Sequence, residues 1–159
     1  MTINGNIIAH RGIHDNKELY YQTVVRKRSG GSMTINLEEE YSLDLGIEYY
    51  EIAEKVVSEA LDYENCPYEC EVNIILTDNE EIHKINKECR DIDRPTDVLS
   101  FPMAEYQQAG DFGLLEEEQP ECFHPESGEL MLGDIIISLD RVKEQAQSYG
   151  HSYTREYAF

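Results

Sequence analysis

The sequence predicts an α+β fold, in which a small mixed sheet of about four strands packs against helices. Short segments with an apolar residue at every second position, which is typical of strands, alternate with longer segments whose apolar residues recur at helical spacing. A length of 159 residues suits one domain with a core of its own. No segment approaches the ~18 consecutive apolar residues that a membrane span requires, so we expect no membrane contact.

The first half of the predicted domain contains two strands and two helices. A first strand is predicted at Ile35 and Leu37, which alternate with polar neighbours. The region 47–61 follows as an amphipathic helix, with its apolar side formed by Ile52, Ala53, Val56, Val57, Ala60 and Leu61. The apolar residues Val72, Ile74 and Leu76, at every second position, predict the second strand. Asp78 then caps a second helix, with Glu81 at the third position.

The stretch 93–102 combines a rigid turn with a strand. Pro95 fixes its own φ and moves Arg94 out of helical geometry, so the chain has to turn after the second helix. The apolar residues Val98, Leu99 and Phe101 then predict a third strand, which Pro102 closes.

The rest of the chain predicts one loop, one strand and two helices. Residues 104–129 are rich in carboxylates, Gly and Pro, which indicates a solvated loop with at most a short turn of helix. Residues 130–137 form a buried strand that Gly133 and Asp134 interrupt. A helix is then capped by Ser138 and stopped by Gly150. After Ser152 a last helix begins, and we expect it to be incomplete because it stops on apolar residues without a cap.

We expect residues 1–32 to lie outside the domain. Met33-Thr34-Ile35-Asn36 repeats the first four residues and follows a Ser29-Gly30-Gly31-Ser32 segment of linker composition. We therefore expect a domain over 33–159. Residues 1–32 are then an N-terminal extension, left by an upstream start or by cloning, without regular structure.

Charge and cysteine content narrow the possible roles. The chain has 33 acidic and 13 basic side chains, a net charge of −20, which argues against broad binding to nucleic acid. A nucleic-acid substrate would have to be held by a local basic spot or a metal. The four cysteines form no CxxC pair, and the first thirty residues have no apolar signal segment, which favours free thiols and a cytoplasmic protein.

Several motifs resemble one family in sequence order. They are Leu76–Ile82, Asn86, Arg90, the turn and strand 93–102, the segment 133–138, the segment 149–152 and the pair Arg155-Glu156. They resemble the YbeY endoribonucleases, the ribosomal RNA maturation factors of bacteria, over about 33–159. The resemblance implies a metallohydrolase-like fold and a zinc-dependent, single-strand-specific endoribonuclease. Such an enzyme acts in 3′ end maturation of small-subunit rRNA and in ribosome quality control. Its implied partners are rRNA, a small-subunit ribosomal protein and a ribosome-assembly GTPase.

The family holds its zinc with three histidines in a His-x3-His-x5-His pattern, directly after the segment that resembles 151–159. The five histidines here do not match that pattern; they are His10, His14, His83, His124 and His151. We therefore expect no zinc ligand in this chain and a domain that lacks its C-terminal metal-binding segment. Such a zinc matters because it lowers the pKa of a bound water to about 7 and so supplies a nucleophile.

Six residues are candidates for the site. The resemblance assigns a catalytic role to Arg90, whose guanidinium suits a phosphate group; without it, an arginine at a helix end is ordinary surface chemistry. Thr96, Asp97 and Ser100 are expected either to meet substrate or to act as hydrogen-bonding residues of the turn and strand. Gly133 and Asp134 are expected either in a substrate groove or at a bulge.

The sequence leaves three functions open. The first is the metal-dependent endoribonuclease, and the second is a non-catalytic ribosome-biogenesis module that binds partners without cleaving RNA. The third is a plain acidic interaction domain. The first two differ in whether the metal-binding histidines belong to the protein.

We predict that the purified polypeptide 1–159 holds no stoichiometric zinc and cleaves RNA negligibly. The physical reason is that a phosphodiester needs a better nucleophile than bulk water at neutral pH. Elemental analysis and a nuclease assay with added zinc test this expectation. Stoichiometric zinc together with metal-dependent cleavage would overturn it.

Overall fold

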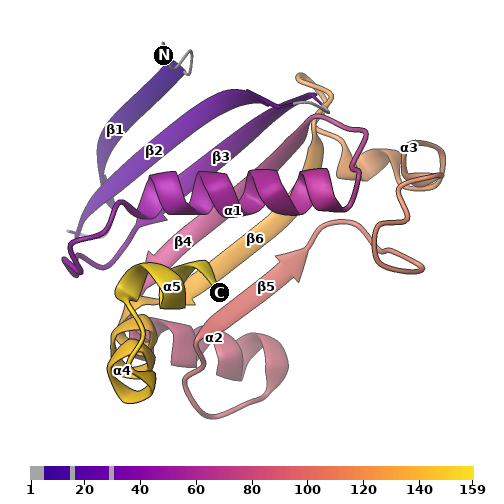
Figure 1. Ribbon diagram of the computed structural model, residues 1–159. Helices are drawn as coiled ribbons and strands as arrows, with labels where there is room; N and C mark the ends of the chain where they lie inside the picture. The colour runs from indigo at the N-terminus through magenta and orange to yellow at the C-terminus, as the bar shows by residue number, and fades with distance from the viewer. Residues whose placement is uncertain (1–5, 15–16, 29–30) are drawn as a thin grey trace.

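The structure is a computed structural model, which describes residues 6–14, 17–28 and 31–159, with side chains from Ser32 onward. In this part of the chain, one six-stranded sheet has the order β1-β2-β3-β4-β6-β5 (Figure 1). The strands are β1 (Asn6–His14), β2 (Lys17–Arg28), β3 (Gly31–Glu39), β4 (Cys70–Thr77), β5 (Val98–Pro102) and β6 (Leu130–Ser138). Strands β3, β4 and β6 run parallel, whereas β5 runs antiparallel to β6 at the edge.

Helices cover both faces and one end of this sheet. They are α1 (Tyr49–Tyr63), α2 (Asn79–Arg90), α3 (Leu115–Glu118), α4 (Leu139–Tyr149) and α5 (Tyr153–Ala158), with a 3₁₀ turn η1 (Pro120–Cys122). Helix α1 crosses the front face in Figure 1. Successive strand residues point to opposite faces, so Ile74 belongs to the core under α1 and its neighbour Ile75 packs with α2. The sheet face that α2 covers carries a smaller hydrophobic cluster, formed by Ile75, Ile82, Ile85, Leu99, Phe101 and Ile136.

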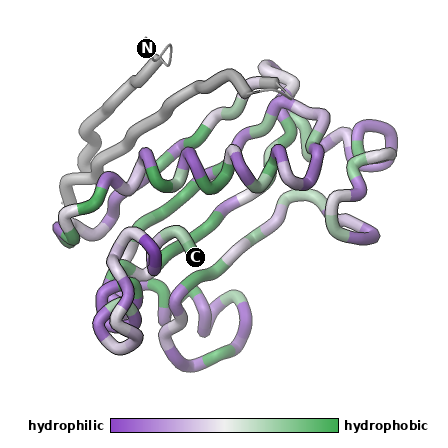
Figure 2. Tube along the Cα trace, in the orientation of Figure 1, coloured by the Kyte–Doolittle hydropathy of each residue, from purple (hydrophilic) through white to green (hydrophobic). Residues whose placement is uncertain are grey.

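The α+β fold predicted from the sequence is confirmed. The four expected strands correspond to β3, β4, β5 and β6, and the sheet is mixed. Figure 2 shows the hydrophobic residues concentrated on β4, β6 and the inner side of α1, with hydrophilic residues in the loops. Among the described residues, none of the helices has the length and apolar character of a membrane span.

Residues 1–32 differ from the expectation where the structure describes them. The backbones of Asn6–His14 and Lys17–Arg28 form β1 and β2, where the sequence predicts no regular structure. These strands pair antiparallel with each other and β2 pairs with β3, which itself begins at Gly31. Residues 1–5, 15–16 and 29–30, including half of the predicted linker, lie outside the described residues. A separate domain that begins at residue 33 stays a prediction.

The three helix caps expected from the sequence are present. The side chain of Asp78 accepts from the Glu81 amide at 2.8 Å, and those of Ser138 and Ser152 accept from the amides three residues on. Gly150 has the left-handed φ of 68° that ends α4. Helix α5 then packs against α1, because the buried Tyr157 ring meets Tyr49 edge-on at 5.3 Å.

The acidic segment expected as a loop carries slightly more structure. Helix α3 and the turn η1 lie within it, and each buries one residue, Leu115 and Cys122. The ring of Phe112 contacts both Tyr68 and Tyr106 edge-on, which fastens the loop to the end of the sheet.

The backbones of β5 and β6 approach each other closely at Gly133. Gly133 has φ +115°, and a β-carbon built on it would lie 2.1 Å from the carbonyl oxygen of Phe101 and 3.0 Å from the amide nitrogen of Met103. The register of β4 on β6 shifts at the same place, between Glu71 and Val72. The predicted interruption of the strand is therefore a bulge where two backbones approach.

We predict that Gly133→Ala lowers the free energy of unfolding by more than about 2 kcal/mol, since it adds both a positive-φ penalty and a clash with backbone. The matched control is Gly128→Ala, where φ is +75° and no atom lies within 4 Å, so only the backbone penalty of about 1 kcal/mol applies. Urea unfolding measures both. Equal losses would contradict the close approach.

Candidate functional site

Arg90 is the last residue of α2 and lies against the free edge of β5. Its Nη2 donates to the carbonyl oxygen of Ser100 at 3.0 Å, and its Cζ lies 5.7 Å from the ring centroid of Phe101. Arg90 is exposed and forms no ion pair with any side chain that the structure describes. Its positive charge is thus held in place by an aromatic ring and a carbonyl and remains available to an anion.

The turn after Arg90 is anchored to α2. Asp91 adopts a left-handed φ of 57°, which turns the chain out of the helix. The buried Asn86 then donates its Nδ2 to the carbonyl oxygen of Arg94 at 2.8 Å. The Asp93 carboxylate bonds to Lys87 at 2.9 Å and to His83 at 2.7 Å, and these two contacts, that of Lys87 first, lower the pKa of Asp93. The turn therefore delivers β5 in a fixed position.

Thr96 and Asp97 lie at the other end of β5 and are not brought to Arg90. Thr96 Oγ1 and the Val98 amide both donate to Asp97 Oδ1 at 3.0 Å, and Gln145 of α4 reaches Oδ2 at 3.5 Å. Burial acts to raise the pKa of Asp97, but the hydrogen bonds from Thr96, Gln145 and Val98 outweigh it, so its pKa lies below the ordinary value. The contacts of Thr96 and Asp97 hold the start of β5 in place. Contact of these two residues with substrate stays a prediction.

Ser100, Gly133 and Asp134 border a hollow between α1 and the β5–β6 edge. The hollow has a volume of about 260 Å³ and is mostly apolar, with Val57, Ala60, Val72, Pro102, Leu132 and Ile135 among its walls. The structure thus brings Ser100, Gly133 and Asp134 together at this hollow. Arg90 contacts the same strand, because it bonds to the Ser100 carbonyl. Their role toward a substrate stays a prediction.

A row of polar side chains crosses three strands on the sheet face opposite to α1. Asn36 of β3 donates to Asn73 of β4 at 2.9 Å, and Asn73 donates to Asp134 of β6 at 2.8 Å. Asp134 is in register with Phe101 of β5, the residue beneath Arg90. Sequence reasoning missed both asparagines. The sequence does mark their positions, because each asparagine lies between two apolar residues of a predicted strand, and so on the opposite face of that strand.

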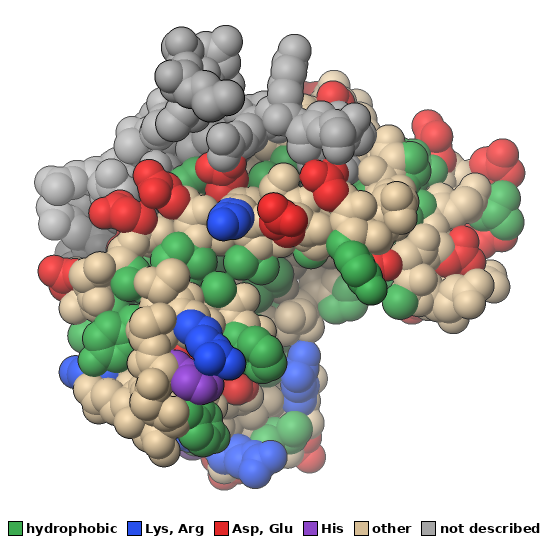
Figure 3. All heavy atoms as spheres, in the orientation of Figure 1, with side chains coloured by type: hydrophobic (Ala, Val, Ile, Leu, Met, Phe, Trp, Pro, Cys, Tyr) green, Lys and Arg blue, Asp and Glu red, His purple; other side chains and the backbone are tan. Residues whose placement is uncertain are grey.

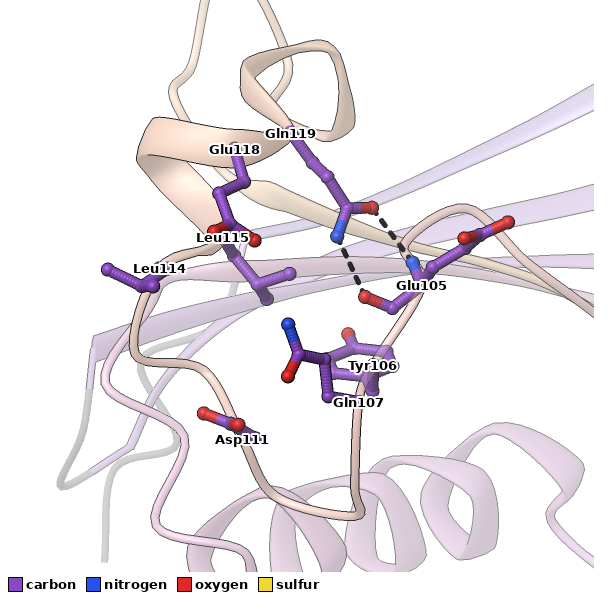
Figure 4. A pocket seen from close by; sticks show the side chains of 8 residues that line it. All are labelled: Glu105, Tyr106, Gln107, Asp111, Leu114, Leu115, Glu118 and Gln119. Carbon is purple, nitrogen blue, oxygen red and sulfur yellow. Dashed lines mark hydrogen bonds between the residues drawn. The ribbon is translucent and has the colours of Figure 1, made fainter.

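A second pocket lies within the acidic loop. Figure 4 shows Glu105, Asp111 and Glu118 around a cavity of about 420 Å³, closed at one side by Gln119, whose amide exchanges two hydrogen bonds with the backbone of Glu105 at 2.7 and 2.9 Å. It is larger than the hollow at the sheet edge, but its lining has carboxylates and no Lys or Arg. It is therefore unsuited to an anionic ligand.

The charges of the face in Figure 3 are unevenly placed. Asp and Glu side chains follow α1 and the acidic loop, whereas most Lys and Arg side chains lie below α1, around the other helices. Among the residues that the structure describes, no three His, Cys, Asp or Glu side chains form a group that could hold a metal ion.

An unpaired arginine at the free edge of an α+β sheet is the kind of site that binds a phosphate group. Comparison with known proteins identifies the class further: the family model of the endoribonuclease YbeY matches residues 35–159. The chain belongs to the YbeY family of endoribonucleases.

The relatives of this chain carry the same description. Endoribonuclease YbeY of Agathobacter rectalis is 58% identical over 127 residues, and that of Lachnoclostridium phytofermentans is 56% identical over 127 residues. Each match covers 80% of this chain and 77% of the relative. The solution structure of TM1509 from Thermotoga maritima is similar with a TM-score of 0.45 and 25% identity, over 79% of this chain and 63% of that one.

We predict that Asp97→Asn lowers stability at neutral pH by less than about 1 kcal/mol, because the carboxylate is largely exposed. The pKa of Asp97 is lowered on folding, so its contribution is complete above the unfolded value of about 3.8 and disappears as the pH falls through the lower folded value. Unfolding curves of both proteins from pH 7 downward should therefore converge in acid. A difference that grows as the pH falls would contradict this assignment.

Proposed function

We propose that this protein acts on RNA as a metal-dependent, single-strand-specific endoribonuclease in 3′ end maturation of small-subunit rRNA and in ribosome quality control, in the cytoplasm. Family membership supports the endoribonuclease role. The observation that carries the proposal in this chain is the unpaired Arg90 guanidinium, held over Phe101 at the free edge of β5.

Arg90 supplies the phosphate contact in this proposal. Its planar fork of donors matches two phosphate oxygens, and its charge stabilises the negative charge that develops on a phosphate during cleavage. Because one Nη is already fixed by the Ser100 carbonyl, the guanidinium is oriented before RNA arrives. A net charge of −20 disfavours broad, non-specific binding of RNA, so a locally positive position such as Arg90 is needed to hold a phosphate.

A metal belongs to the proposal through the family resemblance, which implies zinc. The described residues do not bring together a set of donors that fits it. We therefore assign no step to a metal, and the roles given to Arg90 and Phe101 do not depend on one.

We also propose a small-subunit ribosomal protein and a ribosome-assembly GTPase as partners. The acidic loop favours a basic protein, since opposite charges steer association. Its eight carboxylates over 104–129, without any Lys or Arg, support this partner chemistry. The same feature supports the alternative, a ribosome-biogenesis module that binds partners and RNA without cleaving RNA.

We predict that Arg90→Ala weakens binding of a fluorescein-labelled single-stranded RNA about tenfold, the loss expected for one charge-assisted phosphate contact of about 1.4 kcal/mol. The affinity of Arg90→Lys should lie between those of the wild type and Arg90→Ala, because lysine keeps the charge and lacks the planar fork of donors. Fluorescence anisotropy at low salt measures the affinities.

Lys84→Ala is the matched control, since Lys84 lies on the same helix and is already paired with Glu80 and Glu81. It removes the same charge and should change the affinity less than twofold. Equal losses for Arg90→Ala and Lys84→Ala would reject the site at the β5 edge. Metal-dependent cleavage by this polypeptide would reject the non-catalytic module, whereas binding without cleavage is expected of residues 1–159 under both functions.

A further inference from the structure

We infer that Asn36 and Asn73 are positioning residues that aim the Asp134 carboxylate at a 2′-hydroxyl of the RNA held by Arg90. This inference rests on the proposed function and adds to it a physical basis for distinguishing RNA from DNA. It is carried by the row of hydrogen bonds that crosses β3, β4 and β6.

The three side chains stand in one line because of strand register. Asn36 is opposite Asn73 in the β3–β4 pair, and Asn73 is opposite Asp134 in the β4–β6 pair. Side chains at paired positions lie on the same face of a sheet. All three are half-buried, on the face opposite to α1.

The hydrogen bonds fix which way each group points. Asn36 Nδ2 donates to Asn73 Oδ1 at 2.9 Å, and also to Glu71 Oε1 at 2.9 Å. With its oxygen occupied in this way, Asn73 turns its nitrogen toward Asp134 and donates to Oδ1 at 2.8 Å. Asp134 Oδ2 has no hydrogen-bond partner among the described residues, so one oxygen of a fixed carboxylate remains open.

Strand register connects Asp134 to the proposed phosphate site. Asp134 is in register with Phe101, and the Arg90 guanidinium lies over the Phe101 ring. A carboxylate repels a phosphate and accepts hydrogen bonds, so at this position it requires a donor on the ligand. The sugar next to a bound phosphate carries such a donor in RNA, the 2′-hydroxyl, and lacks it in DNA.

A purely structural reading of the row is that it ties three strands together. In that case its loss would reduce stability and would affect RNA and DNA binding alike. A double-mutant cycle between Asn73 and Asp134, measured on both nucleic acids, separates the two readings.

The experiment uses the full 159-residue chain with fluorescein-labelled single-stranded RNA and DNA of one sequence. We expect the wild type to prefer RNA. Asn73→Ala should weaken RNA binding about threefold, and Asp134→Ala should weaken it further. DNA binding should not weaken in either variant, and it should become tighter in Asp134→Ala, because a charge that repels the phosphate is removed. In the Asp134→Ala background, Asn73→Ala should have no additional effect, because Asn73 acts through Asp134.

Asn79→Ala is the control, since Asn79 also joins two segments by side-chain bonds, to Ser138 and Glu144, and is outside the row. It should leave the preference for RNA unchanged. If Asn73→Ala does not fold, as judged by thermal unfolding, Asn36→Ala provides the same test one step farther from Asp134.

The outcomes are distinguishable. Equal loss of RNA and DNA affinity, or an undiminished effect of Asn73→Ala without Asp134, overturns the inference. RNA binding that depends on Arg90 but shows no preference over DNA overturns the inference and leaves the proposed function intact. No RNA binding by the wild type overturns both. A preference that follows base sequence assigns Asp134 to an amino group of a base and overturns the assignment to the 2′-hydroxyl.

Discussion

The close approach of β5 to β6 at Gly133 is the constraint on which the site depends. A side chain at this position would meet the backbone of Phe101, so the absence of a β-carbon is what allows the two strands to pair there. The pairing places Phe101 opposite Asp134 and turns the Ser100 carbonyl outward, where Arg90 reaches it. One backbone contact therefore sets the positions of the ring, the carboxylate and the guanidinium.

Two contacts fix the N-terminal end of β5. Helix α2 holds the turn before the strand through Asn86, so that Arg90 and the start of β5 cannot move independently. The Ser138 amide also donates to the Asp97 carbonyl, which joins the start of β5 to the end of β6. Arg90 also occupies an outward carbonyl and Pro102 lacks an amide hydrogen, so the edge strand is protected against pairing with another chain.

Local features of the fold were predictable from the sequence, and contacts across the sheet were not. The caps at Asp78, Ser138 and Ser152 depend on residues three positions apart, and the local pattern of apolar residues indicated the four strands β3 to β6. The row from Asn36 to Asp134 depends on the register of strands far apart in the chain, which no local pattern contains. The linker composition near residue 30 likewise gave no indication that β2 pairs with β3, because backbone groups form that pairing.

Hydrogen exchange at single-residue resolution tests the β5–β6 pairing most directly. In an antiparallel edge strand, alternate amides bond to the neighbour and the others point to solvent. The structure predicts slow exchange for Leu99 and Phe101, which pair with β6, and fast exchange for Ser100, whose carbonyl faces Arg90 at the free edge. Exchange of Leu99 and Phe101 as fast as that of Ser100 would contradict the pairing, and with it the position of the whole site.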